Sequence, residues 1–157
     1  QILHLAGAGE DVPVRAAYET AALTARVAPF LADMAAAFAA ADVVVARAGA
    51  STLAELARCG LPAVLIPFQG ASGHQRANAR AVECSGGGFV LEETEATPQR
   101  VGNALRWLAA DVQLRRAMGV QMRLLNQPDA AERLAEAVTQ IVRAHHTHHP
   151  SAMPVVG

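Results

Sequence analysis

Short apolar runs recur along this chain, and each is followed by a longer segment with helical periodicity. Val43 to Ala46 and Ala63 to Pro67 are the clearest of these runs, because their apolar residues follow one another without alternation. A strand that is apolar on both faces is typical of a parallel sheet whose two sides are covered. Single helices between the runs favour right-handed βαβ units. The sequence therefore predicts an α/β fold with a mostly parallel sheet flanked by helices.

Capping and turn signals place the individual elements. We expect strands at residues 2–5, 26–28, 43–46, 63–67 and 89–91, and helices at residues 13–23, 34–41, 52–58, 74–84, 98–109, 112–124 and 129–144. Asp33 is expected to cap the second of these helices, and Gly60 to end the third. We expect residues 1–144 to form one domain and residues 145–157 to form a disordered tail that contains His and Pro. The chain opens within a strand and without Met, so we expect it to be a piece of a longer protein.

The composition excludes several classes of protein. There are 13 basic residues, all of them Arg, and 14 acidic residues, which give a net charge of −1. This balance argues against a nucleic-acid binder that works through a basic field. No stretch reaches the roughly 20 apolar residues that span a bilayer. Cys59 and Cys84 are too few for a disulfide framework or a zinc cluster, so we expect both to be small, buried or half-buried residues in a reducing compartment. The histidines at 145–149 are able to bind a metal adventitiously, but we expect no functional metal site.

The loop after the third predicted strand has the chemistry of an anion site. Residues Arg47 to Glu55 read R-A-G-A-S-T-L-A-E. Gly49 allows a ligand to approach the backbone, and the N–H groups at the start of the next helix suit a phosphate. Ser51 and Thr52 add hydroxyl donors. Glu55 has two interpretations: spacing alone favours a T-x-x-E capping box on Thr52, but the carboxylate is also able to accept hydrogen bonds from a ribose diol. The sequence contains neither G-x-G-x-x-G nor a P-loop motif, which excludes those two modes of nucleotide binding.

The loop after the fourth predicted strand is polar and leads into a helix. His74 and Gln75 begin that helix. Ligands of parallel sheets bind beyond the carboxyl ends of the strands, so this loop and the previous one border the same crevice. The imidazole and amide groups are able to bind sugar hydroxyls; the alternative is an ordinary first helical turn with solvated side chains. The acidic residues at 92–95 are expected at a solvated strand end. The residues alone therefore indicate a nucleotide- or sugar-binding domain without an identifiable catalytic base.

Several segments together carry a resemblance to a known family. They are F-L-A-D-M at 30–34, A-D-V-V-V-A-R-A-G-A-S-T-L-A-E at 41–55, G-L-P-A-V-L-I-P-F-Q at 60–69, His74, Gln75, Asn78 and P-D-A-A-E-R at 128–133. This combination resembles the carboxyl-terminal, donor-binding domain of the MurG-type GT-B glycosyltransferases. The resemblance implies a Rossmann-like C-terminal half of a GT-B enzyme, with its first strand and Gly-rich loop missing. The amino-terminal domain, which holds the acceptor site, the catalytic base and the membrane patch, would also lie outside this chain.

The resemblance also implies a function and a set of binding residues. The family transfers N-acetylglucosamine from UDP-GlcNAc to lipid I, the lipid-linked muramyl pentapeptide, which gives lipid II for peptidoglycan. The implied donor-binding residues are Leu31 for uracil through its backbone, Glu55 for the ribose hydroxyls, Gly49, Ser51 and Thr52 for the diphosphate, Arg47 for the loop or the phosphates, and His74 and Gln75 for the GlcNAc hydroxyls.

The parent protein would then be an inverting hexosyltransferase that needs no cofactor or bound metal, and this chain alone would be inactive. Its implied partners are UDP-GlcNAc, the N-terminal acceptor domain and, through that domain, lipid I, with no nucleic acid. The implied location is peripheral, on the cytoplasmic face of the bacterial inner membrane. Two alternatives stay open: a related UDP-sugar glycolipid synthase with another acceptor, and a non-enzymatic nucleotide-sugar-binding module.

Overall fold

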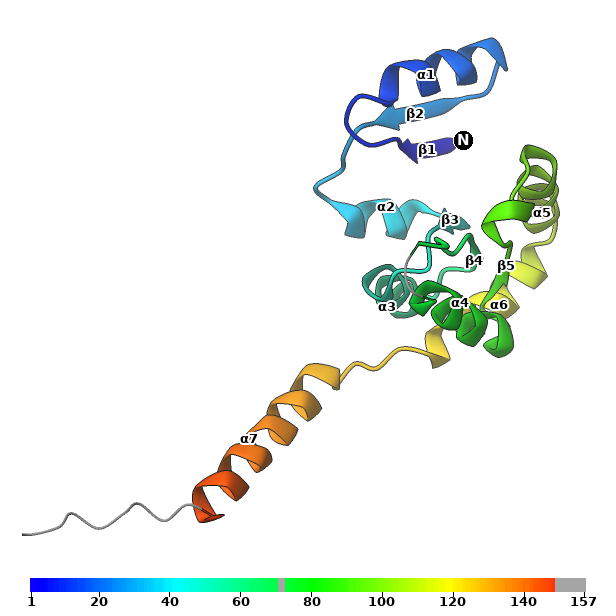
Figure 1. Ribbon diagram of the computed structural model, residues 1–157. Coiled ribbons are helices and arrows are strands. Elements are labelled where there is room, and N and C mark those ends of the chain that lie inside the picture. Colours follow the sequence, from blue (N-terminus) through cyan, green and yellow to red (C-terminus); the bar gives the residue numbers. More distant parts are fainter. Residues whose placement is uncertain (71–72, 149–157) are drawn as a thin grey trace, which may run out of the picture.

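The computed structural model describes residues 1–70 and 73–148. Its strands are β1 (Ile2–Leu5), β2 (Ala25–Ala28), β3 (Val44–Ala46), β4 (Ala63–Leu65) and β5 (Gly88–Val90). Its helices are α1 (Asp11–Thr20), α2 (Met34–Ala40), α3 (Ala50–Cys59), α4 (His74–Ser85), α5 (Pro98–Ala110), α6 (Val112–Leu124) and α7 (Ala130–His148), and a 3₁₀ turn, η1 (Glu93–Glu95), precedes α5. Figure 1 shows β1, α1 and β2 as a small unit, the elements from α2 to α6 as a larger one, and α7 extending away from both.

The described strands form two parallel sheets. β1 pairs with β2, so that Ile2 lies opposite Ala25. In the second sheet β4 lies between β3 and β5, with Val64 opposite both Val45 and Phe89. Parallel strands joined through helices confirm the predicted α/β class. Because the three strands of the larger sheet run the same way, the loops that follow them leave from one edge.

The larger sheet is covered on both faces, as its unbroken apolar strands predict. Ala63, Val64 and Leu65 of β4 are fully buried. Successive side chains of a strand point to opposite faces. Ala63 and Leu65 accordingly share an apolar cluster with Leu56 of α3, whereas Val64 shares a second cluster with Leu108 of α5. This packing fixes α3 against the sheet and places its first turn at the edge where the loops leave.

α6 packs closely against the end of α3. Gly60 ends α3 in the left-handed conformation, with φ 67°, as predicted. The Arg123 guanidinium donates to the carbonyl oxygen of Cys59 at 3.2 Å. A Cβ atom on Gly119 would lie 2.6 Å from the carbonyl oxygen of Gly60. Only a glycine at position 119 therefore allows the two segments to approach this closely.

The small unit has little share in this core. Neither apolar cluster includes a residue before Met34. Within the unit, His4 Nδ1 and the Tyr18 hydroxyl lie 3.0 Å apart and join β1 to α1. His4 therefore lies within a strand, and its side chain has a hydrogen-bond partner. Residues 29–33 connect the small unit to α2.

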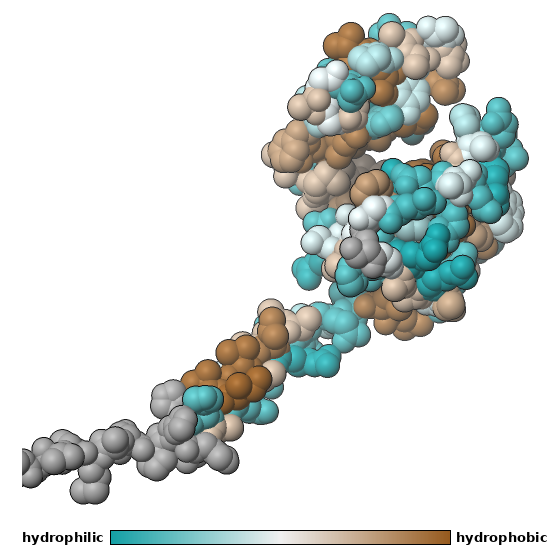
Figure 2. Space-filling view, viewed as in Figure 1, coloured by the Kyte–Doolittle hydropathy of each residue, from teal (hydrophilic) through white to brown (hydrophobic). Residues whose placement is uncertain are grey.

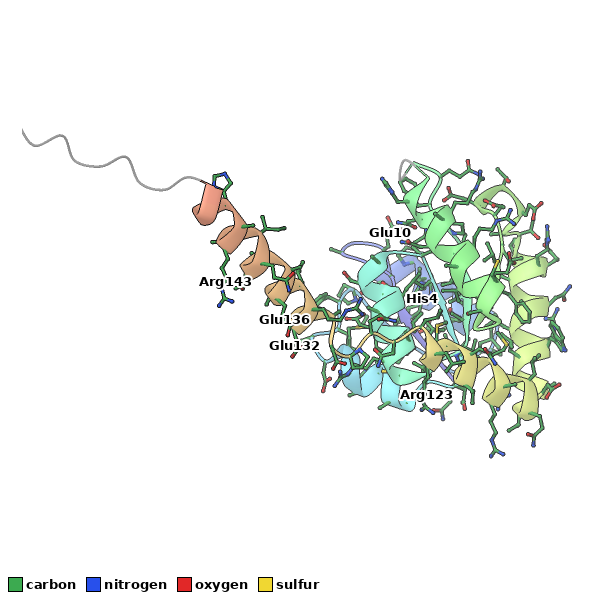
Figure 3. All side chains as sticks on the ribbon, turned by 90° about the horizontal axis from the view of Figure 1, so that it is seen from below. His4, Glu10, Arg123, Glu132, Glu136 and Arg143 are labelled. Atoms are coloured by element: carbon green, nitrogen blue, oxygen red, sulfur yellow. The ribbon has the colours of Figure 1, made fainter. Side chains whose placement is uncertain are left out.

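α7 carries an exposed apolar stripe. Leu134, Val138, Ile141 and Val142 all lie on it with at least 49% of their surface exposed. Figure 2 shows this stripe as a continuous brown area along the helix. In Figure 3, which is seen from below, Arg143 near the far end of the same helix lies well apart from the larger unit.

Several local predictions differ from the structure. α1 spans Asp11–Thr20, whereas residues 13–23 were predicted, and β4 ends at Leu65 and not at residue 67. α3 begins at Ala50 and not at Thr52, because Gly49 adopts the extended N-cap conformation (φ −68°, ψ 143°). α7 runs to His148, beyond the end predicted at 144, and residues 149–157 of the predicted tail lie outside the described residues. Cys84 is exposed, whereas burial or half-burial was predicted. It follows the buried Val82 by two positions, which places it on the other side of α4.

Candidate functional site

The candidate site lies where the loops after β3, β4 and β5 leave the larger sheet. Asn78 of α4 joins two of these regions, because its Nδ2 donates to the carbonyl oxygen of Ala48 at 3.1 Å. Ala48 is fully buried, so this bond satisfies a carbonyl that water does not reach. The motif that suggested the family contains Asn78, but the sequence predicted no role for it. The structure shows that Asn78 holds the start of α4 against the loop before α3.

The start of α3 presents backbone N–H groups that have no acceptor within the helix. The first intrahelical hydrogen bond runs from Leu53 N–H to Gly49 C=O at 3.0 Å. The N–H groups of Ala50, Ser51 and Thr52 precede it and are left over. No side chain of the described residues forms a capping hydrogen bond at this end of the helix. Together with the helix dipole, such an end favours a phosphate group.

The capping box predicted for Thr52 and Glu55 is wrong. Thr52 is the third residue of α3 and not its N-cap, so Glu55 lies in the second turn, away from the left-over N–H groups. Glu55 is exposed. Among the side chains that the structure describes, it has no hydrogen-bond or ion-pair partner. Positions four apart share one helix face, so this carboxylate stands on the same face as Ser51 and is free to accept hydrogen bonds from a ligand.

His74 and Gln75 differ in their surroundings although they are neighbours. Both follow Gly73, which caps α4 with φ 79°. His74 is exposed, whereas Gln75 is half-buried. The Oε1 atom of Gln75 accepts the backbone N–H of Phe68 at 3.0 Å. This bond orients the amide of Gln75 and leaves its Nε2 group as the end that can donate.

Arg47 is held by several groups at the edge of the sheet. Its Nη2 lies 2.6 Å from Glu93 Oε1, its Nη1 donates to Ile66 C=O at 3.2 Å, and its Cζ lies 5.5 Å from the centre of the Phe68 ring. The other carboxylate oxygen of Glu93 accepts the backbone N–H of Gln69 at 3.3 Å. The hydrogen bond from Arg47, and then that from Gln69, hold the pKa of Glu93 below its ordinary value of 4.5. This engagement favours the loop-supporting role of Arg47 over a phosphate-binding one.

A pocket of about 340 Å³ lies beside this cluster. It is lined by Pro67, Phe68, Gln69, Gly73, Arg76 and Glu92. Arg76 Nη2 lies 2.9 Å from Glu92 Oε2, which joins α4 to the end of β5. Glu95 pairs with Arg100 at 2.9 Å. The acidic residues at 92–95 therefore pair with Arg side chains, where a solvated strand end was predicted. These acidic residues directly follow β5, and Arg47 directly follows β3 of the same sheet. That shared position at the carboxyl ends of two strands was the signal in the sequence for the pairing.

Leu31 lies apart from these groups. It belongs to the segment that follows β2, a strand of the smaller sheet, and it is half-buried. Among the described residues, no hydrogen bond joins Leu31 to the loops after β3 or β4. The structure thus places Arg47, Gly49, Ser51, Thr52, Glu55, His74 and Gln75 around one edge of the larger sheet, and Leu31 on a separate segment.

Two further features bear on the chemistry of the site. In the described parts of the chain, no three His, Cys, Asp or Glu side chains come together in a way that would hold a metal ion. None of the helices in the same ranges is both long enough and apolar enough to cross a bilayer. The histidines at 145–149 fall partly outside the described residues.

Known proteins are similar to this chain in sequence and in fold. A protein from Xanthomonas axonopodis pv. citri (strain 306) is 43% identical over 141 residues, which cover 89% of this chain and 33% of that protein. A protein from Sorangium cellulosum (strain So ce56) is 39% identical over 160 residues, which cover 100% of this chain and 39% of that protein. Both are named UDP-N-acetylglucosamine--N-acetylmuramyl-(pentapeptide) pyrophosphoryl-undecaprenol N-acetylglucosamine transferase. The crystal structure of Acinetobacter baumannii MurG superposes with a TM-score of 0.79 at 33% identity, over 88% of this chain and 40% of that one.

The chain spans between 33% and 39% of the length of these two curated relatives. The similarity confirms the resemblance to MurG-type transferases and the predicted half of a GT-B fold. A family model, described as the glycosyltransferase family 28 C-terminal domain, matches residues 1–134. That range contains both sheets and every loop of the candidate site. The chain belongs to the glycosyltransferase family 28 C-terminal domain family.

Proposed function

We propose that this chain is the donor-binding part of an inverting N-acetylglucosaminyltransferase that makes lipid II from lipid I. The names of the relatives specify the sugar and a pyrophosphoryl-undecaprenol acceptor. In this proposal UDP-GlcNAc binds at the edge formed by the loops after β3, β4 and β5. The acceptor binds to a part of the longer protein outside this chain, at the cytoplasmic face of the bacterial inner membrane, where the protein is peripheral.

The start of α3 is the observation that carries the proposal. Its left-over N–H groups at Ala50, Ser51 and Thr52 suit a diphosphate, and Glu55 on the same helix face supplies an unpaired acceptor for the two ribose hydroxyls. In a nucleoside diphosphate, the diphosphate and the ribose hydroxyls lie next to each other. A helix end with only a capping function would have left Glu55 bonded to the backbone.

The chemistry assigned to this chain is stabilisation of the leaving group. When the bond between the sugar and the diphosphate breaks, negative charge develops on the departing UDP. Fixed N–H dipoles at the start of α3 stabilise that charge without reorganising. Gln75 and His74 bind hydroxyls of the sugar, and Leu31 contacts the uracil through its backbone. The group that removes the acceptor proton lies outside this chain, so the chain alone is inactive.

Calorimetric titration of the chain tests the proposal. We expect saturable binding of UDP-GlcNAc and no binding of ADP-glucose, with UDP-glucose bound more weakly. Glu55→Ala should weaken UDP-GlcNAc by about tenfold or more, because a charged acceptor of two hydroxyls is lost. The free energy of unfolding should change by less than about 0.5 kcal/mol, because Glu55 is exposed.

Glu83→Ala is the matched control. Glu83 is also an exposed helical carboxylate, but it lies in the last turn of α4. The control should bind UDP-GlcNAc like the unaltered chain. Equal weakening by both substitutions would contradict the role of Glu55. A folded chain that binds none of the three nucleotides would contradict the proposal that this chain holds the donor site.

A further inference from the structure

Arg47 and Glu93 reach across the end of a strand that lies between them. Arg47 directly follows β3, Glu93 opens the turn after β5, and β4 is the strand in the middle. Their ion pair at 2.6 Å therefore closes over the loop that leaves β4. The two side chains keep 50% and 31% of their surface exposed, and exposed pairs contribute little to the free energy of unfolding. The importance of this pair lies in the loop segments that it holds.

The pair holds the loop after β4 at two consecutive residues. Glu93 accepts the backbone N–H of Gln69 at 3.3 Å, and the Arg47 guanidinium covers the ring of Phe68. The ring also folds over Gly70, since a Cβ there would lie 2.7 Å from it. Backbone and side chain of this short segment are thus both fixed from the side of Arg47 and Glu93.

The same segment orients Gln75. The backbone N–H of Phe68 donates to Gln75 Oε1 at 3.0 Å. Phe68 lies between this bond and the one at Gln69, so the hydrogen bond at Gln69 and the contact of Arg47 with the Phe68 ring together limit rotation of the Phe68 backbone. Glu93 is therefore connected to the amide of Gln75 through two hydrogen bonds and the backbone of one residue, Phe68.

We infer that Glu93 is a positioning residue, which together with Arg47 clamps residues 68–70 after β4 and so fixes the Gln75 amide toward a hydroxyl of the bound sugar. The inference rests on the proposed function for its ligand. It assigns to Glu93 no contact with the donor. Loss of the clamp should therefore weaken the binding of the sugar and leave the binding of the nucleotide nearly unchanged.

Nuclear magnetic resonance of the ¹⁵N-labelled chain tests the clamp without a ligand. The side-chain NH₂ signals of Gln75 should be displaced from random-coil positions in the unaltered chain. Glu93→Gln keeps the shape of the side chain but removes the charge that binds Arg47. We expect it to move the Gln75 signals toward random coil and to speed exchange of the Gln69 amide by about fivefold or more.

Glu95→Gln is the matched control. Glu95 lies in the same turn and pairs with Arg100 at 2.9 Å, but it forms no hydrogen bond or ion pair with the described residues of the loop after β4. It should leave the Gln75 signals in place. Gln75 signals that stay unchanged in Glu93→Gln, or that move equally in Glu95→Gln, would overturn the inference.

Titration with UDP and with UDP-GlcNAc tests the consequence for the ligand. Glu93→Gln should weaken UDP-GlcNAc by about five- to tenfold, the value of one lost hydrogen bond, and UDP by less than about twofold. Equal weakening of both ligands would overturn the sugar-specific role of the clamp. If the unaltered chain binds neither ligand, the proposed function fails, and the Gln75 signals still decide whether the clamp exists.

Discussion

Gly119→Ala should destabilise this protein, although the same substitution stabilises an unconstrained helix. In the interior of α6, replacing Gly by Ala gains about 1 kcal/mol of helix propensity. Against this gain, the new Cβ would lie 2.6 Å from the carbonyl oxygen of Gly60. That atom belongs to the backbone, and Gly60 already has a φ of 67°, so it cannot rotate away as a flexible side chain does.

The magnitude follows from these two opposing effects. Contacts of a Cβ below 3.0 Å are essentially never seen, so α6 and the end of α3 must separate by some tenths of an ångström. Overpacking of this kind costs about 1–3 kcal/mol. Subtracting the gain of about 1 kcal/mol in propensity leaves a net loss of up to about 2 kcal/mol in the free energy of unfolding.

Urea unfolding gives the measurement, and a second glycine gives the control. The chain has one Trp, Trp107, which stacks on Phe89 with ring centres 5.0 Å apart, so its fluorescence reports on packing in the larger unit. Gly102 lies inside α5, where a Cβ would meet only the end of the Arg106 side chain at 3.6 Å. Gly102→Ala should therefore stabilise the chain by about 0.5–1 kcal/mol. If Gly119→Ala and Gly102→Ala each raise the free energy of unfolding, the packing argument for Gly119 is refuted.

Three further predictions concern hydrogen bonds described above. Asn78→Ala should lower the free energy of unfolding by about 1–3 kcal/mol in urea titration, because it leaves a buried carbonyl without its donor; no change would show that water replaces the amide. Asp33→Ala should lower it by about 1 kcal/mol in the same assay, since the carboxylate caps α2 by accepting a backbone N–H at 2.9 Å. For Glu93 the pKa is lowered from 4.5, so the clamp is fully formed above that pH and is lost as the pH falls through the lower value. The Gln69 amide signal, followed from neutral to acidic pH, should show one transition below pH 4.5, and that transition should be absent in Glu93→Gln.

Much of the fold could be predicted from the sequence, because the signals for it are local. The unbroken apolar run at 63–67 predicted a strand buried on both faces, and β4 is such a strand. Asp33 predicted a helix start, and its Oδ1 accepts the N–H of Ala36. Gly60 predicted a helix end and has the left-handed conformation that such an end requires. Each of these features depends on a few neighbouring residues.

The start of α3 shows where local reasoning failed. T-x-x-E satisfies the capping-box pattern at Thr52, but Ala50 and Ser51 are also compatible with a helix, and Gly49 adopts the extended conformation of an N-cap without a side chain. The helix therefore begins earlier than the box requires. This geometry leaves the Glu55 carboxylate available to a ligand. Spacing alone did not favour that interpretation of Glu55.

The contacts between loops could not be predicted from the sequence. Arg47 and Glu93 are 46 positions apart, and only the order of β3, β4 and β5 brings them together. The acidic residues at 92–95 look like a solvated turn until that order is known. The half-buried state of Gln75 could not be predicted either, because it depends on the path of the loop after β4.

The separation between the small unit and the main core also has a thermodynamic consequence. Since no residue before Met34 enters either apolar cluster, hydrogen exchange in β1 and β2 is expected to proceed through partial opening that leaves the larger unit folded. Leu31 lies in the segment that joins the units, and the left-over N–H groups of α3 lie in the larger one. A donor that contacts both must select conformations in which the two units are correctly aligned. Its apparent affinity is then the intrinsic affinity multiplied by the population of those conformations, and any mutation that rigidifies residues 29–33 in the bound form should strengthen binding without adding a contact.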